Sequence, residues 1–452
     1  MRPALLRHGA PSGAAAAAAT ITAPALLLTL LPLPLLLLLL LARPAAAAAL
    51  LPPWPSTYDV AASTLVMPCN SSGLLSTALT RAWGLVSYDW SNAKRGPAGW
   101  VQQRPMDCEE RLLEQAQAAK AANPSQRVGV YRNSLKMLSW FSSVRAKLED
   151  AAYAPWFLRF DNASAPFTND PCDRNFDPPL CSALYHDQWG APGYPTPGPS
   201  GDGDCAAPNC NCGSVPCGEY FLDFRRLTDT PVNGQTMLAW YLGEYMISNT
   251  TLRSGLVDFL FLDDGWDCSG PTEVAPGFAH DTGLSGADFC DIAQGYAAAQ
   301  AAFAAAIVAA GGFTWQQFYN SGTAAGPIVA KDACAATLRA WCAESSPAAS
   351  QAILYGFTGT QDKTNSTPTG FAQDLANVQL IRGDYAFLGY SWRGCDEPIF
   401  RPPELDLDYG VPLGLCAETA PGVFSRNFSR STVTMDCASW TPTITFKNAS
   451  SA

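Results

Sequence analysis

The stretch Asp258–Trp266, DFLFLDDGW, decides the fold of this chain. Four bulky apolar residues, Phe259–Leu262, are followed at once by two acids, a glycine and a tryptophan. An apolar run of this length, bounded by turn residues, predicts a strand that is buried on both faces. Parallel α/β proteins place their chemistry at the carboxyl ends of such strands, so Asp263 and Asp264 are the first candidate site residues. The alternative is a helix cap, a position that aspartate commonly takes.

Apolar runs typical of strands alternate with alanine-rich runs typical of helices on both sides of this stretch. Strands are predicted at 63–67, 84–90, 127–131, 219–224, 257–264, 313–319, 352–357 and 385–392, and helices at 107–122, 137–150, 234–248, 285–310, 327–342 and 370–382. Strands that alternate with helices of this length predict βαβ units and a parallel sheet.

The length of this repeating region predicts a (β/α)8 barrel of the TIM type. Without the segment 160–218, the residues from Gly84 to Trp392 match the roughly 250 residues of such a barrel. A doubly wound open sheet is the alternative. It usually carries a Gly-rich phosphate loop after its first strand, and this chain shows none.

The same pattern predicts how the chain is divided. The barrel is expected over 51–404, interrupted by the Cys-rich insertion 160–218, which we expect disulfides to hold without a core of its own. Residues 405–452 are expected to form a small β-appendage, because 423–437 alternates with period two around polar residues, as a β-hairpin does.

Residues 1–50 resemble a signal peptide. Arg2 and Arg7 precede an alanine-rich run, a leucine-rich run and the small residues Ala46–Ala49, which are suitable for cleavage. The apolar run 24–42 is also just long enough to span a bilayer, so an uncleaved type II anchor is the alternative. In either case the rest of the chain is predicted to be extracellular or to lie in the lumen of the secretory pathway, with no other contact with a membrane.

Cysteines and glycosylation motifs agree with that compartment. The chain has 15 cysteines, many of them between Cys108 and Cys217, and an oxidising compartment favours disulfides. Because 15 is odd, at least one thiol is left over or pairs between chains. A zinc site at Cys210 and Cys212 is the weaker alternative, since no histidine lies near. N-glycosylation sequons occur at Asn70, Asn162, Asn249, Asn365, Asn427 and Asn448.

The composition excludes one class of partner. The formal net charge is −11, and no basic cluster follows residue 10, so we expect no binding to nucleic acid.

Nearly every predicted strand ends in an acid, an amide, a guanidinium or a large aromatic side chain. Carboxylates can perform acid–base and nucleophilic chemistry on sugars, while amides, guanidinium groups and aromatic rings bind them. The candidate catalytic residues are Asp223, Asp263 and Asp264. The candidate substrate-binding residues are Asp89, Trp90, Arg132, Asn133, Arg225, Trp266, Tyr319, Asn320, Tyr390 and Trp392.

Asp223 and the Asp263–Asp264 pair end neighbouring predicted strands, whose axes are about 5 Å apart, and this closeness favours a retaining glycosidase pair. The alternative for Asp223 is a salt bridge to Arg225 or Arg132. Asp258 begins its strand and is therefore assigned to the opposite, stabilising face of the barrel. No strand end carries cysteine or histidine and no G-x-S-x-G motif occurs, so we expect no metal, no cofactor and no serine hydrolase.

The phrases YFLDFRR (220–226) and GLVDFLFLDDGW (255–266) resemble uncharacterised glycoside-hydrolase-like barrel families of algae and protists. The later stretches DLDYGVPLG (406–414) and VFSRNFSRSTVTMDC (423–437) resemble the end of the same families. The resemblance implies a (β/α)8 barrel, a carbohydrate substrate and an acidic role for Asp223 and Asp263. DDGW is also similar to the α-galactosidase clan, which implies that Asp263 and Asp264 bind sugar hydroxyls.

Together these features predict a secreted glycoside hydrolase that acts on a poly- or oligosaccharide by a two-carboxylate mechanism. A catalytically inactive, glycan-binding barrel, of lectin type or associated with a cell wall or surface, is the alternative, because the chain shows no glutamate at a late strand end.

Overall fold

The computed structural model describes residues 57–68, 70–95, 98–169, 171–173, 180–187, 212–229, 231–316, 331–343, 352–355, 370–383, 386–393 and 401–447. The chain divides into two compact units, residues 1–49 and 50–452, and every described residue belongs to the second unit.

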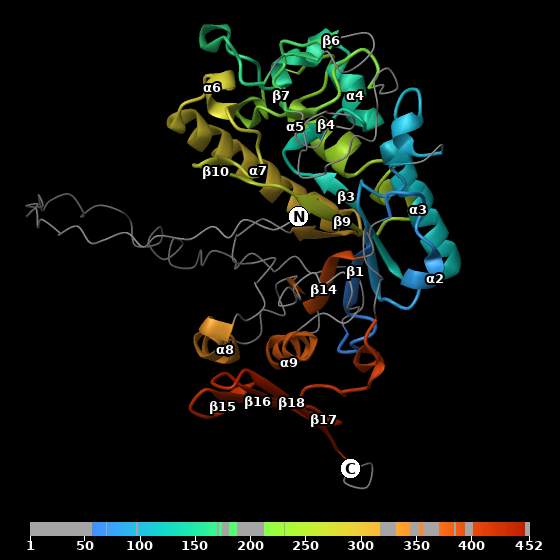
Figure 1. The fold of residues 1–452 in the computed structure, drawn as a ribbon, viewed down its shortest axis with the longest axis vertical. Coiled ribbons are helices and arrows are strands. Elements are labelled where there is room, and N and C mark those ends of the chain that lie inside the picture. Colours follow the sequence, from blue (N-terminus) through green and yellow to red (C-terminus); the bar gives the residue numbers. More distant parts are fainter. Residues whose placement is uncertain are drawn as a thin grey trace, which may run out of the picture. The chain divides into compact units, whose positions relative to one another are not determined.

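Seven parallel strands form the main sheet of this unit (Figure 1). They are β1 (Thr64–Pro68), β2 (Leu85–Tyr88), β3 (Arg127–Asn133), β9 (Phe259–Asp263), β12 (Phe313–Gln316), β13 (Ala352–Tyr355) and β14 (Ala386–Arg393). Their order in the sheet is β12-β9-β3-β2-β1-β14-β13. The last strand therefore pairs with the first, and the strands follow one another in chain order, as in a barrel.

The predicted α/β class and parallel sheet are confirmed. Among the described residues, β12 and β13 are not paired, so the sheet is open between them. An eighth strand and complete closure of the barrel stay predictions.

One predicted strand of the main sheet is wrong. Residues 219–224 contribute β8 (Glu219–Phe221), which belongs to a separate antiparallel sheet with β4 (Lys136–Leu138) and β7 (His186–Asp187). The apolar run there is buried by aromatic packing, because Phe221 contacts Tyr185 and Phe278. The helix predicted at 137–150 is correspondingly shorter: after β4, α4 covers only Ser142–Leu148.

Helices connect the parallel strands much as the sequence predicts. They are α2 (Thr77–Thr80), α3 (Cys108–Ala122), α5 (Met237–Trp240), which continues as the π-helix η5 (Tyr241–Met246), α6 (Phe278–Thr282), α7 (Gly286–Ala309), α8 (Cys334–Ala343) and α9 (Phe371–Ile381). Short 3-10 helices are η1 (Trp100–Gln102), η2 (Ala151–Trp156), η3 (Asn162–Ser164), η4 (Phe224–Arg226), η6 (Leu252–Ser254), η7 (Lys331–Ala333) and η9 (Pro403–Asp406).

α7 begins with a capping box, in which Ser285 and Asp288 satisfy each other's backbone N–H groups. Within the described ranges it is the one helix that is long and apolar enough to cross a bilayer by composition. Ile292, Tyr296 and Phe303 are nevertheless buried in the core, so this composition is weak evidence for a membrane span.

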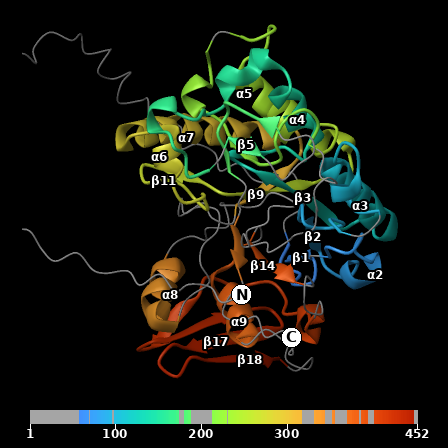
Figure 2. The same cartoon turned by 45° about the horizontal axis from the view of Figure 1, so that its top comes forward.

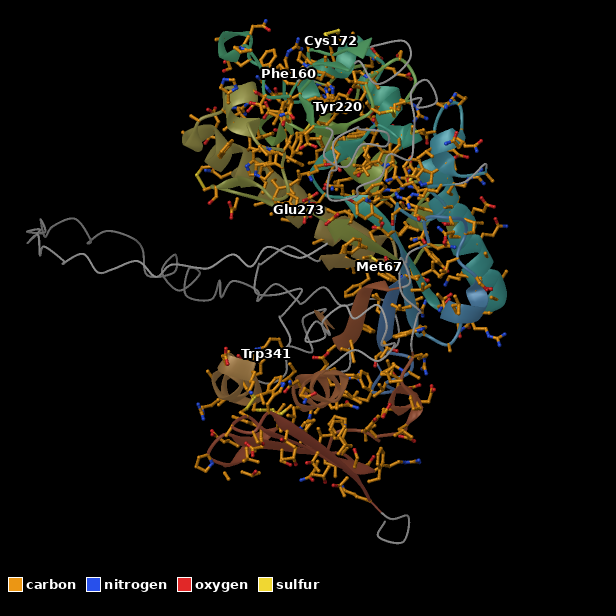
Figure 3. All side chains as sticks on the ribbon, in the orientation of Figure 1. Met67, Phe160, Cys172, Tyr220, Glu273 and Trp341 are labelled. Carbon is orange, nitrogen blue, oxygen red and sulfur yellow. A yellow bond between two sulfur atoms is a disulfide. The ribbon has the colours of Figure 1, made fainter. Side chains whose placement is uncertain are left out.

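The described parts of the 160–218 insertion have both disulfides and a core. Cys172–Cys181 joins β5 (Cys172–Asp173) to β6 (Leu180–Cys181), and Cys212–Cys217 closes a second small loop. Phe160, however, packs against Phe167 and Tyr185. Disulfides are therefore not the sole support of these residues, because their aromatic side chains continue the core of the antiparallel sheet (Figure 3). Residues 188–211, which include most of the polar stretch behind the expectation of no separate core, lie outside the described residues.

The predicted hairpin at 423–437 is confirmed and forms part of a larger sheet. β16 (Val423–Asn427) and β17 (Ser431–Asp436) are its two strands, flanked by β15 (Ala417–Ala420) and β18 (Thr441–Phe446). In both views α9 lies between β14 and this sheet (Figures 1 and 2). The disulfides Cys334–Cys437 and Cys342–Cys416 also join both ends of α8 to the sheet, so it is tied to the helical layer.

Candidate functional site

The candidate site begins at the carboxyl ends of β3 and β9, where Asn133 is paired in register with Asp263. Alternation along a strand would send Asp263 and Asp264 to opposite faces. Asp264 has a left-handed backbone, with φ of +61°, and this turn keeps both acids in contact with the same face of β3. The Tyr131 hydroxyl donates to Asp263 Oδ2 at 2.9 Å, and Asn133 Nδ2 donates to Asp264 Oδ2 at 2.6 Å.

Lys136 joins these residues to the antiparallel sheet. Its Nζ lies 3.1 Å from Asp264 Oδ2 and 3.1 Å from Glu219 Oε2. The two carboxylate oxygens are therefore at most twice that distance apart. Thr272 completes the surroundings of Asp264 by donating from Oγ1 to Oδ1 at 2.9 Å.

A fourth carboxylate, that of Asp187, comes from β7, where Asp187 is paired directly with Glu219. We call Asp187, Glu219, Asp263 and Asp264 the carboxylate cluster. Its members are 0%, 7%, 9% and 3% exposed, so Asp263 reaches solvent most. Two cavities, of about 360 and about 460 Å³, occur elsewhere in the described residues, and no member of the cluster lines either.

Burial raises the pKa values of two of these acids, Glu219 and Asp263. It raises the pKa of Glu219 to about 8, against the opposing pull of Lys136, and Asp187 adds to the rise. Burial, and then the neighbouring Asp264, also hold the pKa of Asp263 well above its usual value. Burial likewise keeps the pKa of Tyr131 high, so its hydroxyl stays a donor to Asp263.

Lys136 stays charged inside the cluster. Burial opposes its charge, but the acidic groups around it together hold the pKa of Lys136 well above its usual value. Asp264 accepts hydrogen bonds from Asn133 and Thr272 and an ion pair from Lys136, so both of its oxygens are held by donors. The arrangement therefore places the donor-held carboxylate of Asp264 across Lys136 from Glu219, whose pKa is raised to about 8, and acid–base catalysis uses two carboxyl groups in different surroundings of this kind.

The structure does not bring Asp223 to the cluster. It lies after β8, outside the main sheet, and its two oxygens accept from Arg225 Nε at 2.8 Å and Nη2 at 2.9 Å. The prediction that Asp223 ends a strand next to β9 is thus wrong, and the salt bridge considered as its alternative is the observed state. Arg225 also pairs with Asp288, so its guanidinium is held by two carboxylates.

Three other predicted binding residues have structural contacts. Trp266 is buried, packs against Phe278 and donates from Nε1 to the Phe289 carbonyl at 3.0 Å. Trp90 packs in a tryptophan cluster with Trp100 and Trp140. Asp89 accepts from the Ser91 backbone at 2.9 Å and closes the turn after β2.

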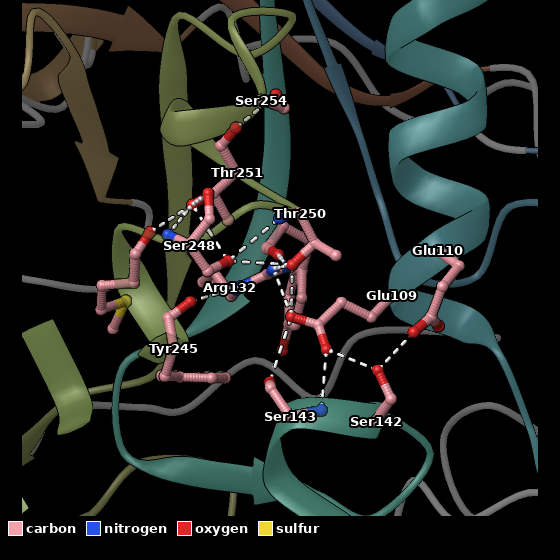
Figure 4. A network of polar contacts seen from close by, with 12 residues as sticks. Glu109, Glu110, Arg132, Ser142, Ser143, Tyr245, Ser248, Thr250, Thr251 and Ser254 are labelled. Atoms are coloured by element: carbon pink, nitrogen blue, oxygen red, sulfur yellow. Dashed lines mark hydrogen bonds and ion pairs between the residues drawn. The ribbon is translucent and has the colours of Figure 1, made fainter. Parts of the chain in front are cut away.

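Because successive side chains of a strand point to opposite faces, Arg132 lies on the other face of β3 from Tyr131 and Asn133. Figure 4 shows Arg132 beside Glu109. Its Nη2 is 2.7 Å from Glu109 Oε1, and both side chains are fully buried. Its Nε donates to the Tyr245 carbonyl at 3.2 Å. Of the residues predicted at the end of this strand, Asn133 therefore joins the cluster and Arg132 does not.

The remaining predicted positions lie outside the described residues. These are Tyr319 and Asn320, together with the side chains of Tyr390 and Trp392 on β14. Their roles stay predictions.

Sequence reasoning missed Glu219, Lys136 and Asp187. Glu219 is the first residue of the run EYFLDF. When this run is assigned to a barrel strand, Glu219 falls at the amino end, and candidate site residues are expected at the carboxyl end. The signal available was the charge of Lys136 and Glu219 within otherwise apolar, buried runs, because buried charges are normally paired.

No family model matches the chain, and no curated protein matches it. The resemblance to barrel families of algae and protists therefore stays a prediction. Among solved structures, a sucrose 6F-phosphate phosphorylase from Thermoanaerobacter thermosaccharolyticum matches with a TM-score of 0.40 and 9% identity, covering 87% of this chain and 96% of that one. A cyclic α-maltosyl-(1→6)-maltose hydrolase from Arthrobacter globiformis gives 0.38 and 10%, covering 85% and 91%. A debranching enzyme from Nostoc punctiforme gives 0.37 and 8%, covering 86% and 90%. Likeness at this level assigns no activity to the chain.

Proposed function

We propose that the chain is a glycoside hydrolase that acts on a poly- or oligosaccharide by a two-carboxylate, retaining mechanism. The observation that carries the proposal is the pair Asp264 and Glu219, held on either side of Lys136 Nζ at 3.1 Å each. Retaining pairs are about 5–5.5 Å apart, and the oxygens of Asp264 and Glu219 that contact Lys136 Nζ, each at 3.1 Å, are close enough for such a pair.

Asp264 is the carboxylate that attacks the anomeric carbon, and donors from Asn133, Thr272 and Lys136 fix its position at the end of β9. Glu219 is the acid that protonates the leaving oxygen, since its pKa of about 8 keeps the proton in place at neutral pH. After the leaving group departs, the same Glu219 takes a proton from water as the glycosyl–enzyme bond is hydrolysed.

Asp263 is the third member of the proposed machinery. Its Oδ1 accepts from the Asp264 backbone N–H at 3.0 Å, and its Oδ2 accepts from Tyr131. Asp263 therefore fixes the strained backbone of its neighbour, and as the most exposed acid of the cluster it is the first that a sugar would meet.

We also propose that the protein is secreted or held in the secretory-pathway lumen, either freely or by an N-terminal type II anchor. Five disulfides within the described residues are consistent with such a compartment: the four already named and Cys268–Cys290. Cys108 is buried without a disulfide.

The test is hydrolysis of a panel of aryl glycosides by the purified protein and by three variants. Asp264→Asn should lose turnover on every substrate and regain part of it with azide, which replaces the missing nucleophile. Glu219→Gln should lose turnover most on substrates with poor leaving groups, because these need the acid. Asp223→Asn should keep turnover, since Arg225 already occupies both oxygens of Asp223.

Two outcomes would contradict the proposal. Full activity of Asp264→Asn would remove the nucleophile from the cluster. Binding on a glycan array without hydrolysis of any substrate would favour the inactive, glycan-binding barrel.

A further inference from the structure

A second polar site lies on the other face of β3 from the carboxylate cluster. A cavity of about 360 Å³ opens there, with hydroxyl side chains of Ser142, Ser143, Ser248 and Thr250 in its lining and Arg253 at its exposed side. This volume falls within the roughly 300–1,000 Å³ of small-molecule sites.

Glu109 lines the cavity and is paired with the buried Arg132 (Figure 4). Glu109 accepts from the Ser143 backbone at 3.0 Å and from Thr250 Oγ1 at 2.7 Å. Ser142 Oγ donates to the same carboxylate at 3.2 Å. A wall of hydroxyl groups ordered by a charge is chemically suited to the hydroxyl and amide groups of a sugar.

Asn249 also lines this cavity, and it is the acceptor of a sequon, Asn249-Thr250-Thr251. It is exposed, and among the described residues its side chain makes no hydrogen bond. Asn70 and Asn427 differ, because their amide oxygens accept from Ser72 and Thr432. Asn162 is exposed on η3 but lines neither cavity, so it is a matched control.

We propose that Asn249 carries an N-linked glycan whose first sugar occupies this cavity. The Asn249 amide nitrogen loses one proton and forms a bond to the anomeric carbon of an oligosaccharide, and the bond from that carbon to a lipid diphosphate breaks, so the diphosphate leaves. The acceptor is modified before its segment folds, and the sugar then folds into place beside Ser248 and Thr250. This inference rests on passage through the secretory pathway and not on the proposed hydrolysis.

The bound sugar has a physical consequence for the fold. It covers the hydroxyl side chains that donate to Glu109 and adds contacts to a wall that already surrounds the buried ion pair of Glu109 and Arg132. The glycan thus acts as a structural ligand, with its contacts supplied by this chain.

The experiment uses the full protein secreted from eukaryotic cells. Glycopeptide mass spectrometry measures occupancy at Asn249 and Asn162, and peptide-N-glycosidase F is then applied to the native protein over time. The Asn162 glycan should be removed quickly, and the Asn249 glycan at least about tenfold more slowly, because the bond is released only when the cavity opens. After denaturation both should be removed at the same rate.

A variant tests the cavity itself without altering the sequon. Arg253→Ala removes an exposed wall of the cavity. The glycosidase should then release the Asn249 glycan from the native protein faster, while the release rate at Asn162 stays the same. The proposal would be overturned by an unmodified Asn249, by equal native release at the two sites, or by an Asn249 glycan that Arg253→Ala leaves resistant. If Asn162 is unmodified as well, the predicted compartment fails together with the proposal, whereas the hydrolysis assay is unaffected.

Discussion

Asp264 is the residue whose conformation determines the site. A non-glycine residue with a left-handed backbone is costly, by about 1–3 kcal/mol, and such residues concentrate at functional positions. The strain is held by the Asp263 carboxylate on the backbone N–H of Asp264 and by Lys136, Asn133 and Thr272 on its side chain. From the sequence, DDGW indicates two acids at a strand end, but it does not indicate that both reach one face.

The first prediction concerns Asp263. An amide in place of the carboxyl offers one oxygen where two are used, so Asp263→Asn must lose the bond from Tyr131 or the bond from the Asp264 backbone. We expect turnover to fall on the order of 10²–10⁴-fold. The Tm should change little, because burial already disfavours a charge there and holds the pKa of Asp263 high.

The control is Asp258→Asn at the other end of β9. Asp258 pairs with Lys120 and Arg127, so this variant should lower Tm and keep turnover per folded molecule. A wild-type rate for Asp263→Asn would remove it from the machinery. Failure of Asp263→Asn to fold would support the helix-cap interpretation instead.

The second prediction concerns pH. Burial raises the pKa of Glu219 from 4.5 to about 8, so the folded state binds this proton more tightly than the unfolded chain does. The stability that Glu219 contributes is therefore complete below pH 4.5 and is lost as pH rises towards about 8. In urea denaturation across this window, the free energy of unfolding should fall less steeply with pH in Glu219→Gln than in the wild type. Parallel slopes would place the proton on another group.

At the scale of elements, the strands that were predicted correctly are those whose apolar runs lie in the parallel sheet. β3 and β9 are examples, since Val130 and Tyr131 on β3 and Phe259–Leu262 on β9 are buried on both faces. β8 failed because a run such as Tyr220–Leu222, buried between aromatic layers, has the same composition as a parallel strand. The partner of a strand depends on residues far away in the chain, which the local composition does not reveal. Assigning 219–224 to the parallel sheet therefore left Glu219 out of the predicted site.

The third prediction uses the two faces of β3. Arg132 and Glu109 are fully buried, and removing one partner of such a pair leaves an uncompensated charge. Glu109→Gln should therefore lower the free energy of unfolding by about 3–5 kcal/mol, measured by urea denaturation. Turnover per folded molecule should be unchanged, because this face is not the one that carries Asn133. A variant of wild-type stability that has lost turnover would return Arg132 to the substrate site, as predicted from sequence.

At the scale of the whole molecule, the C-terminal sheet is joined to the rest of the chain through α8. The sequence identifies the hairpin at 423–437 by its period of two, but it cannot give disulfide partners, because many pairings satisfy the same spacing. The observed pair Cys334–Cys437 spans 103 residues, and Cys342–Cys416 spans 74. Arg339 adds a bidentate ion pair to Glu418. The predicted boundary at residue 405 is therefore crossed by covalent bonds.

The fourth prediction follows from these bonds. Removal of Cys334–Cys437 by a double serine substitution should lower the free energy of unfolding by about 3–4 kcal/mol, since Cys342–Cys416 already shortens the loop. The matched control is removal of Cys172–Cys181, which spans 9 residues and should lower the free energy of unfolding by less. Denaturation of each variant under oxidising conditions measures the difference. An equal loss for the two pairs would contradict the role of the longer bridge.

The most direct measurement of the central claim is covalent trapping. An activated 2-deoxy-2-fluoro glycoside, chosen from the sugar that the aryl glycoside panel identifies, arrests a retaining enzyme at the glycosyl–enzyme stage. Mass spectrometry of the digested protein then locates the modified carboxylate. The account predicts a single label on Asp264 at the end of β9, no label on the Asp264→Asn variant, and continued labelling of Asp223→Asn. A label on a carboxylate outside the cluster would contradict it.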